Sequence, residues 1–256
     1  MRNLIKHGKI LRLHWEKRAR EAKRKNRSPS PLARFYYTTI QDTVQNLASS
    51  PLILKTDLWD HAIEPFNGSL EDLTGTVAQG EIYGIDVSRF VCEEAGKKRL
   101  AKILVADIRA LPFKDNVFDT LLDISTCDHI SLDELPNCLQ DYWRVLRENG
   151  KLFMVFNNCS LYSRTRRNMQ PSQFRWVFPR DAVKKLFCKF FNVISERSID
   201  TFGWIPFSIK IVERFPWFLN VLKTVETSCL SKKMALFSHS YMLVGSPIKE
   251  VEHTAD

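Results

Sequence analysis

Five short apolar runs that alternate with helical patterns between residues 51 and 158 constrain the fold of this 256-residue chain most strongly. Helical segments separate the runs, which lie at residues 52–54, 81–86, 102–107, 118–124 and 151–156. This order of elements is typical of a parallel sheet with helices on both faces. We therefore expect an α/β fold with a Rossmann-like, doubly wound, mostly parallel seven-stranded sheet, closed by runs at 189–197 and 234–245.

Two helical segments between the strands have recognisable bounds. One covers Ser88 to Leu100, and the other runs to about Arg147 and is expected to end at Asn149 and Gly150. The second segment places four apolar residues on one face: Leu135, Leu139, Tyr142 and Leu146. Both helices should cover the sheet.

Two of the predicted strands end on carboxylates, Asp86 and Asp107. In doubly wound sheets, ligands bind at the carboxyl ends of the strands, near the point where the strand order reverses. These residues are therefore candidate ligand contacts. The alternative is that both only cap the segments that follow them.

Three segments, taken in order, resemble a known family. They are Tyr83 to Ser88 (YGIDVS), Val105 to Asp119 (VADIRALPFKDNVFD) and Arg144 to Leu152 (RVLRENGKL). This set is similar to the class I S-adenosylmethionine-dependent methyltransferases of small-molecule type, which typically read G-x-D-x-S, A-D-x-x-x-L-P-F-x-D-x-x-F-D and R-V-L-x-x-G-G-x-L at similar spacings. The ordered set is far more specific than any one element.

The resemblance implies S-adenosyl-L-methionine as the cofactor and gives roles to four residues. Asp86 would accept both ribose hydroxyls, and Val87 would pack against the adenine face. Asp107 would meet the adenine amino group, with the backbone of Ile108 beside the ring.

The loop after the first strand departs from the family pattern, which usually has an acidic residue and a Gly-x-Gly-x-Gly turn there. This chain continues from Lys55 with no glycine before Gly68, so positive φ angles and close approach of a ligand to bare backbone are costly. Two explanations stay open. A similar branch of the family has a Lys-Thr-Asp-Leu-aromatic sequence, in which case Lys55 or Thr56 would hold the cofactor carboxylate and Asp57 its ammonium. Otherwise the fold has lost cofactor binding.

Residues 125–129 (STCDH) follow the fourth strand and are expected over the methionine end of the pocket, with Ser125 against the cofactor. His129, with Asp128 beside it, is the candidate general base for an acceptor that must lose a proton. The alternative is that His129 only lines the pocket or bonds loop backbone.

The basic residues are concentrated at the N-terminus. Between Met1 and Arg34, twelve basic residues stand against two acidic ones, whereas the remainder holds 26 basic and 27 acidic residues. We therefore divide the chain into a basic amphipathic arm and linker (1–34) and a methyltransferase domain (35–256). Leu4, Leu11 and Trp15 share one helical face, which suits an anionic membrane surface or an acidic partner. The alternative is that this face packs on the domain.

Two segments after the fifth predicted strand are candidate substrate or lid insertions, near 160–180 and 201–230. The first is basic and aromatic and would suit an anionic acceptor such as a phosphate, a carboxylate or an acidic lipid headgroup. The second is aromatic-rich and interrupted by Pro206 and Pro216, as in a lid or an interfacial segment. His239 is expected to be structural.

Six scattered cysteines form no C-x-x-C pair, so we expect free thiols, no metal site and a cytoplasmic location, with or without membrane association. The predicted function is methyl transfer from S-adenosylmethionine to a small molecule, lipid or glycan precursor by in-line displacement. The alternative is a catalytically silent methyltransferase-like module that binds a partner or a membrane surface. A nicotinamide-dependent oxidoreductase would need a G-x-G-x-x-G turn. A nucleic-acid partner, as in an RNA methyltransferase, would rest on the arm alone and is not expected.

Overall fold

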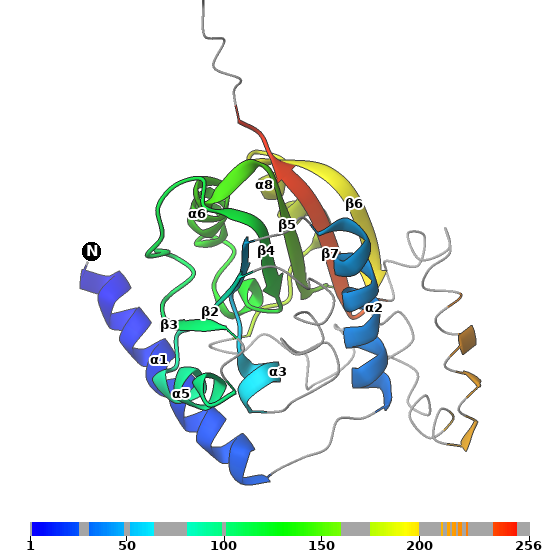
Figure 1. Ribbon diagram of the computed structural model, residues 1–256, viewed down its shortest axis with the longest axis horizontal. Helices are drawn as coiled ribbons and strands as arrows, with labels where there is room; N and C mark the ends of the chain where they lie inside the picture. The colour runs from blue at the N-terminus through cyan, green and yellow to red at the C-terminus, as the bar shows by residue number, and fades with distance from the viewer. Residues whose placement is uncertain are drawn as a thin grey trace, which may run out of the picture.

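The computed structural model describes residues 2–25, 31–48, 52–63, 81–98, 101–159, 175–199 and 238–249, together with single positions between 211 and 224; side chains are described from residue 10 in the first range and from residue 36 in the second. A seven-stranded sheet forms the centre (Figure 1), in the order β3-β2-β1-β4-β5-β7-β6. The strands are β1 (Leu52–Lys55), β2 (Glu81–Asp86), β3 (Lys102–Val105), β4 (Phe118–Ile124), β5 (Leu146–Asn157), β6 (Phe191–Ile199) and β7 (Ser240–Pro247).

The first five strands are parallel, and β7 runs antiparallel to both β5 and β6. The strand order reverses at β1, which lies between β2 and β4. The predicted fold class is therefore confirmed, and the reversal places a ligand site at the carboxyl end of β1.

Helices cover both faces of the sheet (Figure 1). The helical elements are α1 (Arg2–Lys25), α2 (Pro31–Leu47), α3 (Trp59–Ala62), α5 (Arg89–Gly96), the 3₁₀ turn η1 (Cys127–His129), α6 (Leu135–Val145) and α8 (Arg180–Phe187). One hydrophobic cluster joins α6 and α8 to the sheet, and a second joins α1, α2, α3 and α5 to its other face. Three layers result, as parallel sheets require because both faces must be buried.

The chain between α6 and β5 differs from the prediction. Asn149 and Gly150 do not end a helix, since β5 begins at Leu146, directly after α6, and contains both residues. A Cβ atom on Gly150 would lie 2.9 Å from the carbonyl oxygen of Arg147 and 3.1 Å from that of Phe118. The glycine therefore permits close backbone packing at the irregular start of β5, where the prediction had a helix end.

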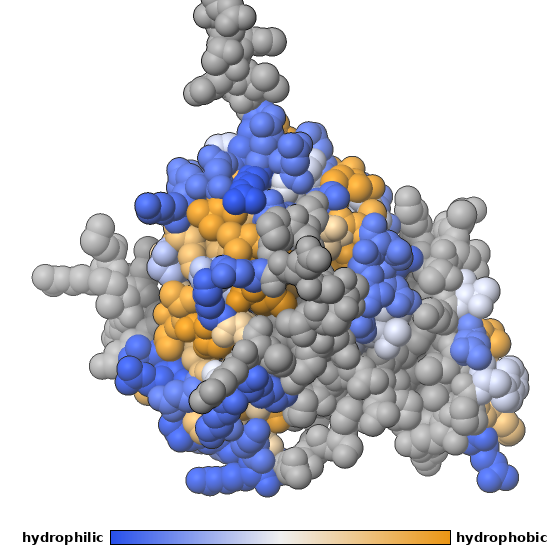
Figure 2. All heavy atoms as spheres, in the orientation of Figure 1, coloured by the Kyte–Doolittle hydropathy of each residue, from blue (hydrophilic) through white to orange (hydrophobic). Residues whose placement is uncertain are grey.

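Helix α1 packs on the body of the protein, as the second of the two alternatives for the N-terminal helix requires. Ala19 and Leu11 are buried, and the guanidinium of Arg20 lies 4.4 Å from the ring centroid of Phe90 in α5. Figure 2 shows hydrophilic residues on the outward faces of α1 and α2. The helix is thus amphipathic with its apolar face already occupied. The side chain of Leu4 lies outside the described residues.

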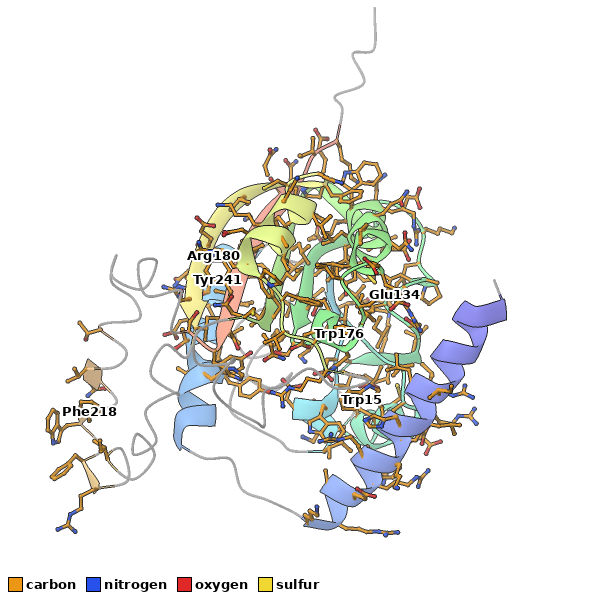
Figure 3. The ribbon with its side chains drawn as sticks, turned by 180° about the vertical axis from the view of Figure 1, so that it is seen from behind. Trp15, Glu134, Trp176, Arg180, Phe218 and Tyr241 are labelled. Atoms are coloured by element: carbon orange, nitrogen blue, oxygen red, sulfur yellow. The ribbon has the colours of Figure 1, made fainter. Side chains whose placement is uncertain are left out.

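The two predicted insertions fall mostly outside the described residues, which include only 175–180 of the first and single positions of the second. Of these positions, Phe215 and Trp217 are 49% and 62% exposed, and Figure 3 shows Phe218 away from the sheet. Among the helices that the structure describes, none has the length and apolar character that a membrane crossing requires.

Candidate active site

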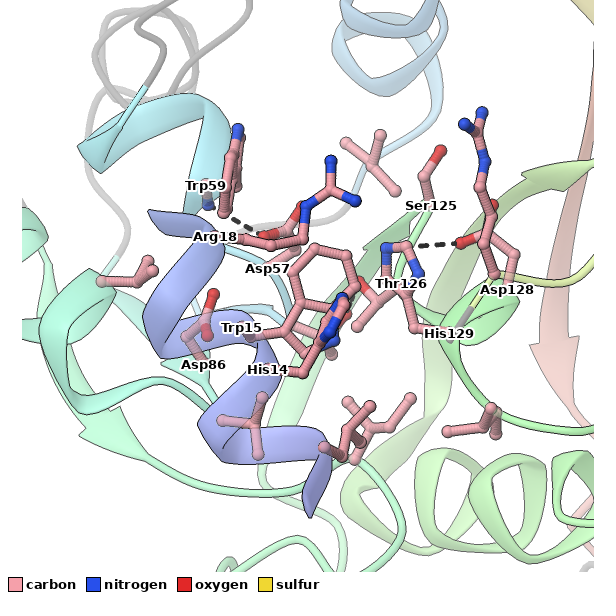
Figure 4. Close-up of a pocket in the computed structure, with 18 of the residues that line it drawn as sticks. His14, Trp15, Arg18, Asp57, Trp59, Asp86, Ser125, Thr126, Asp128 and His129 are labelled. Atoms are coloured by element: carbon pink, nitrogen blue, oxygen red, sulfur yellow. Dashed lines mark hydrogen bonds and ion pairs between the residues drawn. The ribbon is translucent and has the colours of Figure 1, made fainter. Parts of the chain in front are cut away.

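A cleft of about 970 Å³ opens at the carboxyl ends of the parallel strands, where the strand order reverses (Figure 4). The structure brings together nine of the ten residues predicted for the site, which line this cleft: Thr56, Asp57, Asp86, Val87, Asp107, Ile108, Ser125, Asp128 and His129. They come from the ends of four different strands. Residues that are up to 73 positions apart in the sequence thus converge because parallel strands end at one edge of the sheet.

Asp86 is held in place at the end of β2. Its carboxylate accepts hydrogen bonds from the backbone N–H groups of Ser88 at 2.8 Å and of Leu58 at 3.4 Å. Burial, together with repulsion from Asp57, raises the pKa of Asp86 to about 8. A partly buried carboxylate of this kind gains most from a ligand that donates hydrogen bonds.

Asp57 shapes the glycine-free loop after β1. Its Oδ1 atom accepts a hydrogen bond from the N–H of Trp59 at 2.8 Å, so the side chain supports the start of α3. Burial raises the pKa of Asp57 to about 6, although Lys55 opposes the shift. Asp57 and Asp86 therefore form a pair of partly buried acids that repel each other, and a cationic group between them would relieve that repulsion.

Lys55 lies beneath the cleft. Its side chain is fully buried, forms an ion pair with Asp60 at 2.9 Å and also donates to the backbone carbonyl of Asp57. Burial lowers the pKa of Lys55, but the carboxylates of Asp60 and Asp57 outweigh it and raise that pKa. Of the ten predicted site residues, only Lys55 is missing from the cleft lining. Its ammonium supports the loop from below.

Asp107 is already ion-paired at the edge of the cleft. Arg109 donates to it from Nε at 3.0 Å and from Nη2 at 2.6 Å, and Arg109 also reaches Glu134 at 2.7 Å. The bidentate pair fixes the orientation of the carboxylate. Its oxygens retain lone pairs that can accept a further hydrogen bond from a ligand.

The turn after β4 is held by Asp123, a buried residue of that strand. Its carboxylate accepts from the N–H groups of Thr126 at 3.0 Å and Cys127 at 3.1 Å and from the hydroxyl of Tyr142 at 2.8 Å. Within this turn Ser125 has a φ of 59°, a left-handed conformation that strains a residue other than glycine. Strain of this kind commonly accompanies functional sites, and Ser125 lines the cleft.

His129 follows in the same turn, between two side chains. Its Nε2 atom lies 3.8 Å from Oδ1 of Asp128, and its ring centroid lies 4.3 Å from that of Trp15 in α1. Burial raises the pKa of Asp128 well above its ordinary value, with Asp123 adding to the shift. Asn157 donates a hydrogen bond to the other oxygen of Asp128. The imidazole is therefore oriented from both sides.

Several residues that line the cleft were not predicted to do so: Trp15, Arg18, Tyr36, Tyr37, Asn157, Arg175 and His239. His239, predicted to be structural, lies in this lining, and burial together with Arg175 lowers its pKa to about 4. Of these, Arg175 belongs to the basic, aromatic segment near 160–180 that was predicted to suit an anionic acceptor, and Asn157 ends the fifth strand, which is the other sequence signal that pointed here. Among the described residues, no group of three or more His, Cys, Asp or Glu side chains could hold a metal ion.

The chain was compared with protein families, curated sequences and solved structures. The family model of the methyltransferase domain matches residues 68–154. Among curated protein sequences, none matches the chain. Solved structures match it over most of its length at low identity.

Three of these structures illustrate the likeness. Magnesium protoporphyrin IX methyltransferase from Synechocystis PCC 6803, solved with bound S-adenosylhomocysteine, has 11% identity and a TM-score of 0.60, covering 93% of this chain and 98% of that one. Geranyl diphosphate C-methyltransferase from Streptomyces coelicolor has 10% identity and a TM-score of 0.56, with coverage of 83% and 79%. A chain from the complex of the Haloferax volcanii Trm112 methyltransferase activator has 15% identity and a TM-score of 0.61, with coverage of 94% and 97%.

At these identities the solved structures show the fold alone. The family model shows more, but only over the segment that carries β2, β3, β4 and most of β5. Both agree with the ordered motifs of the sequence. Residues 68–154 therefore match a methyltransferase domain, and the sheet around them has the fold of solved S-adenosylmethionine-dependent methyltransferases.

Proposed function

We propose that the protein transfers a methyl group from S-adenosylmethionine to a small molecule, lipid or glycan precursor by in-line displacement. The observation that carries this proposal is the convergence of Asp57, Asp86 and Asp107, from three strand ends, on one cleft. Three carboxylates suit a ligand that is rich in hydroxyl and amino donors.

The hydrogen-bonding side chains of the cleft fit this cofactor. Asp86, fixed by two backbone N–H groups, would accept both ribose hydroxyls. Asp107 would accept from the adenine amino group, with Val87 and Ile108 against the ring. Asp57 would take the ammonium, which relieves the repulsion between Asp57 and Asp86. Thr56 and Ser125 line the cleft beside the methionine end.

The residues of this chain then have limited chemistry to perform. S-adenosylmethionine supplies, when bound, a methyl group on a sulfonium that is already activated. The protein needs to align the acceptor with that methyl group and to exclude water. For an acceptor that must lose a proton, His129 would take it at the nitrogen that faces the cleft, with Asp128 and Trp15 orienting the imidazole.

The remainder of the cleft supports a small or lipid-like acceptor. Trp15, Tyr36, Tyr37 and His129 give it an aromatic wall, and Arg175 adds a positive charge. Such a wall favours an apolar or aromatic body on the acceptor. Two of the similar solved proteins are named for small acceptors, magnesium protoporphyrin IX and geranyl diphosphate.

We also propose a cytoplasmic location, with contact to an anionic membrane or an acidic partner through the outward face of α1. The five described cysteines, Cys92, Cys127, Cys138, Cys159 and Cys188, are all free thiols, which suits a reducing compartment. The residues at the end of α1 add basic charge to the exposed surface.

Calorimetric titration with S-adenosylhomocysteine tests the proposal. We expect binding by the wild type, at least a tenfold loss in Asp86→Asn, and no change in Asp181→Asn, a matched control whose carboxylate is 84% exposed on α8. Absence of binding at millimolar ligand would contradict the proposal and favour the silent module, for which Asp86→Ala should leave function intact.

A further inference from the structure

We propose that α1 is an integral part of the cofactor site and that Arg18 binds the carboxylate of the cofactor's methionine half. This inference rests on the proposed function and deepens it. It replaces Lys55 with a residue from a different part of the chain.

The amino-acid end of the cofactor carries an ammonium and a carboxylate on one carbon atom, so the cleft needs a negative and a positive side chain close together. Asp57 supplies the negative charge. Lys55, the cation predicted for the carboxylate, is buried beneath the loop and forms an ion pair with Asp60 at 2.9 Å. A carboxylate that enters a partly buried cleft without a cation loses hydration without compensation.

Arg18 is placed to supply that cation. It lines the same cleft as Asp57 and Asp86, and Figure 4 shows it extending from α1 toward the side of the cleft where Asp57 lies. Its guanidinium carbon lies 5.7 Å from the ring centroid of Trp15. Within the part of the chain that the structure describes, no carboxylate forms an ion pair with Arg18. Its fork of N–H donors matches a carboxylate in a bidentate manner.

The helix that carries Arg18 is fixed to the rest of the domain. Lys23 donates from Nζ to the carbonyl oxygen of Ala62 at 3.0 Å, and Glu16 accepts from the N–H of Arg89 at 2.9 Å. Trp15 contacts the ring of Trp59 in α3, with centroids 6.0 Å apart. Figure 3 shows Trp15 on the side of α1 that faces the sheet. Arg18 therefore starts from a positioned backbone.

The spacing along α1 supports the same conclusion. Most residues of α1 that line the cleft recur every three or four positions, at Leu11, His14, Trp15, Arg18, Glu21, Ala22 and Lys25, and Lys17 lies at the margin of this face. This is the period of one helix face. The face that the sequence assigned to a membrane or to general packing thus forms a wall of the cofactor cleft.

Other cations near the cleft fit this role less well. Arg175 lies beside the turn that carries Asp128 and His129, since the N–H of the next residue, Trp176, donates to the carbonyl oxygen of Asp128 at 2.7 Å. Lys17 and Lys25 also line the cleft from α1, but each offers a single ammonium and cannot match a carboxylate with two parallel N–H donors. Arg18 carries a planar fork of N–H donors and lies near the ring of Trp15.

Titration calorimetry with two ligands tests the assignment, because 5′-methylthioadenosine contains the nucleoside and sulfur of S-adenosylhomocysteine but no amino-acid carboxylate. We expect Arg18→Gln to bind S-adenosylhomocysteine about tenfold or more weakly and 5′-methylthioadenosine as the wild type does. Arg24→Gln removes the same charge from a residue of α1 outside the cleft lining and should change neither affinity. Arg18 is exposed, so its substitution should leave the melting temperature close to that of the wild type.

Equal affinity of Arg18→Gln and the wild type for S-adenosylhomocysteine would overturn the assignment, and so would equal weakening of both ligands. If Arg18→Gln has a lower melting temperature than the wild type, Arg18→Lys replaces it in the titration. We expect the affinity of Arg18→Lys for S-adenosylhomocysteine to lie between those of the wild type and Arg18→Gln. A wild type that binds neither ligand would instead contradict the proposed function itself.

Discussion

The indole of Trp15 and the imidazole of His129 lie with their ring centroids 4.3 Å apart at an interplanar angle of 54°. One ring belongs to the N-terminal helix and the other to the turn after β4, so the contact joins the helix to the candidate base. Asp128 approaches the same imidazole at 3.8 Å. His129 is therefore held between an aromatic face and an acid, and both should influence methyl transfer.

Trp15→Ala should lower methyl transfer about fivefold, because an aromatic pair contributes roughly 1 kcal/mol to the positioning of its partner. Trp15→Phe keeps an aromatic ring and should retain most of the activity. The measurement is transfer of labelled methyl from S-adenosylmethionine to an acceptor found by screening small molecules and lipids. If Trp15→Ala matches the wild type in kcat, the contact has no role in the reaction.

His129→Gln should lower kcat by at least about a hundredfold for an acceptor that loses a proton, since a positioned base contributes that much. The affinity for S-adenosylhomocysteine should change little, because the ring acts on the acceptor. The same labelled-methyl assay and calorimetry separate the two effects. A parallel loss of cofactor affinity would indicate that His129 lines the cofactor pocket and is not a base.

The stability of the wild type should fall as the pH rises from about 5 to 8. The pKa of Asp86 is about 8 in the folded protein and near 4 in the unfolded chain. Between these values the folded state holds a proton that the unfolded state has lost, so the free energy of unfolding declines by up to about 1.4 kcal/mol per pH unit from this group. Above pH 8 its contribution levels off.

Asp86→Asn removes this titration and should therefore be more stable than the wild type at pH 8 by a larger margin than at pH 5. Urea denaturation at both pH values measures the difference, with Asp181→Asn as the exposed control. A margin that does not depend on pH would show that Asp86 is charged throughout. The expected gain in stability accompanies a loss of cofactor affinity, as is common for buried functional groups.

The sheet, and the site residues at its strand ends, were accessible to prediction from the sequence because both depend on local order. Strands β2 and β4 match the predicted runs at 81–86 and 118–124, and Asp86 follows from its position at a strand end. The position of α1 could not be predicted, because an amphipathic face fits a membrane as well as a protein surface. Lys55 was misleading for a similar reason, since its burial and its pairing with Asp60 arise only from the tertiary fold.

Lys55→Met should destabilise the protein by about 3–5 kcal/mol, because it leaves Asp60 buried without its cation. Lys55→Met combined with Asp60→Leu removes both charges and should recover much of the loss. Urea denaturation measures both variants. If Lys55→Met is as stable as the wild type but binds S-adenosylhomocysteine more weakly, Lys55 contacts the cofactor. That result would count against the assignment of Arg18.

Gly84→Ala should destabilise the protein by about 1–3 kcal/mol, the usual cost of overpacking a core. A Cβ atom at this position of β2 would lie 2.6 Å from Cδ2 of Leu58 and 3.0 Å from Cδ1 of Ile103. Leu58 belongs to the loop whose N–H contacts Asp86, so a displaced Leu58 should also weaken cofactor binding. Leu58→Ala makes room for the new methyl group, and the double variant should lose less free energy of unfolding than the two single changes added together. Strict additivity in urea denaturation would mean that Gly84 does not set the position of this loop.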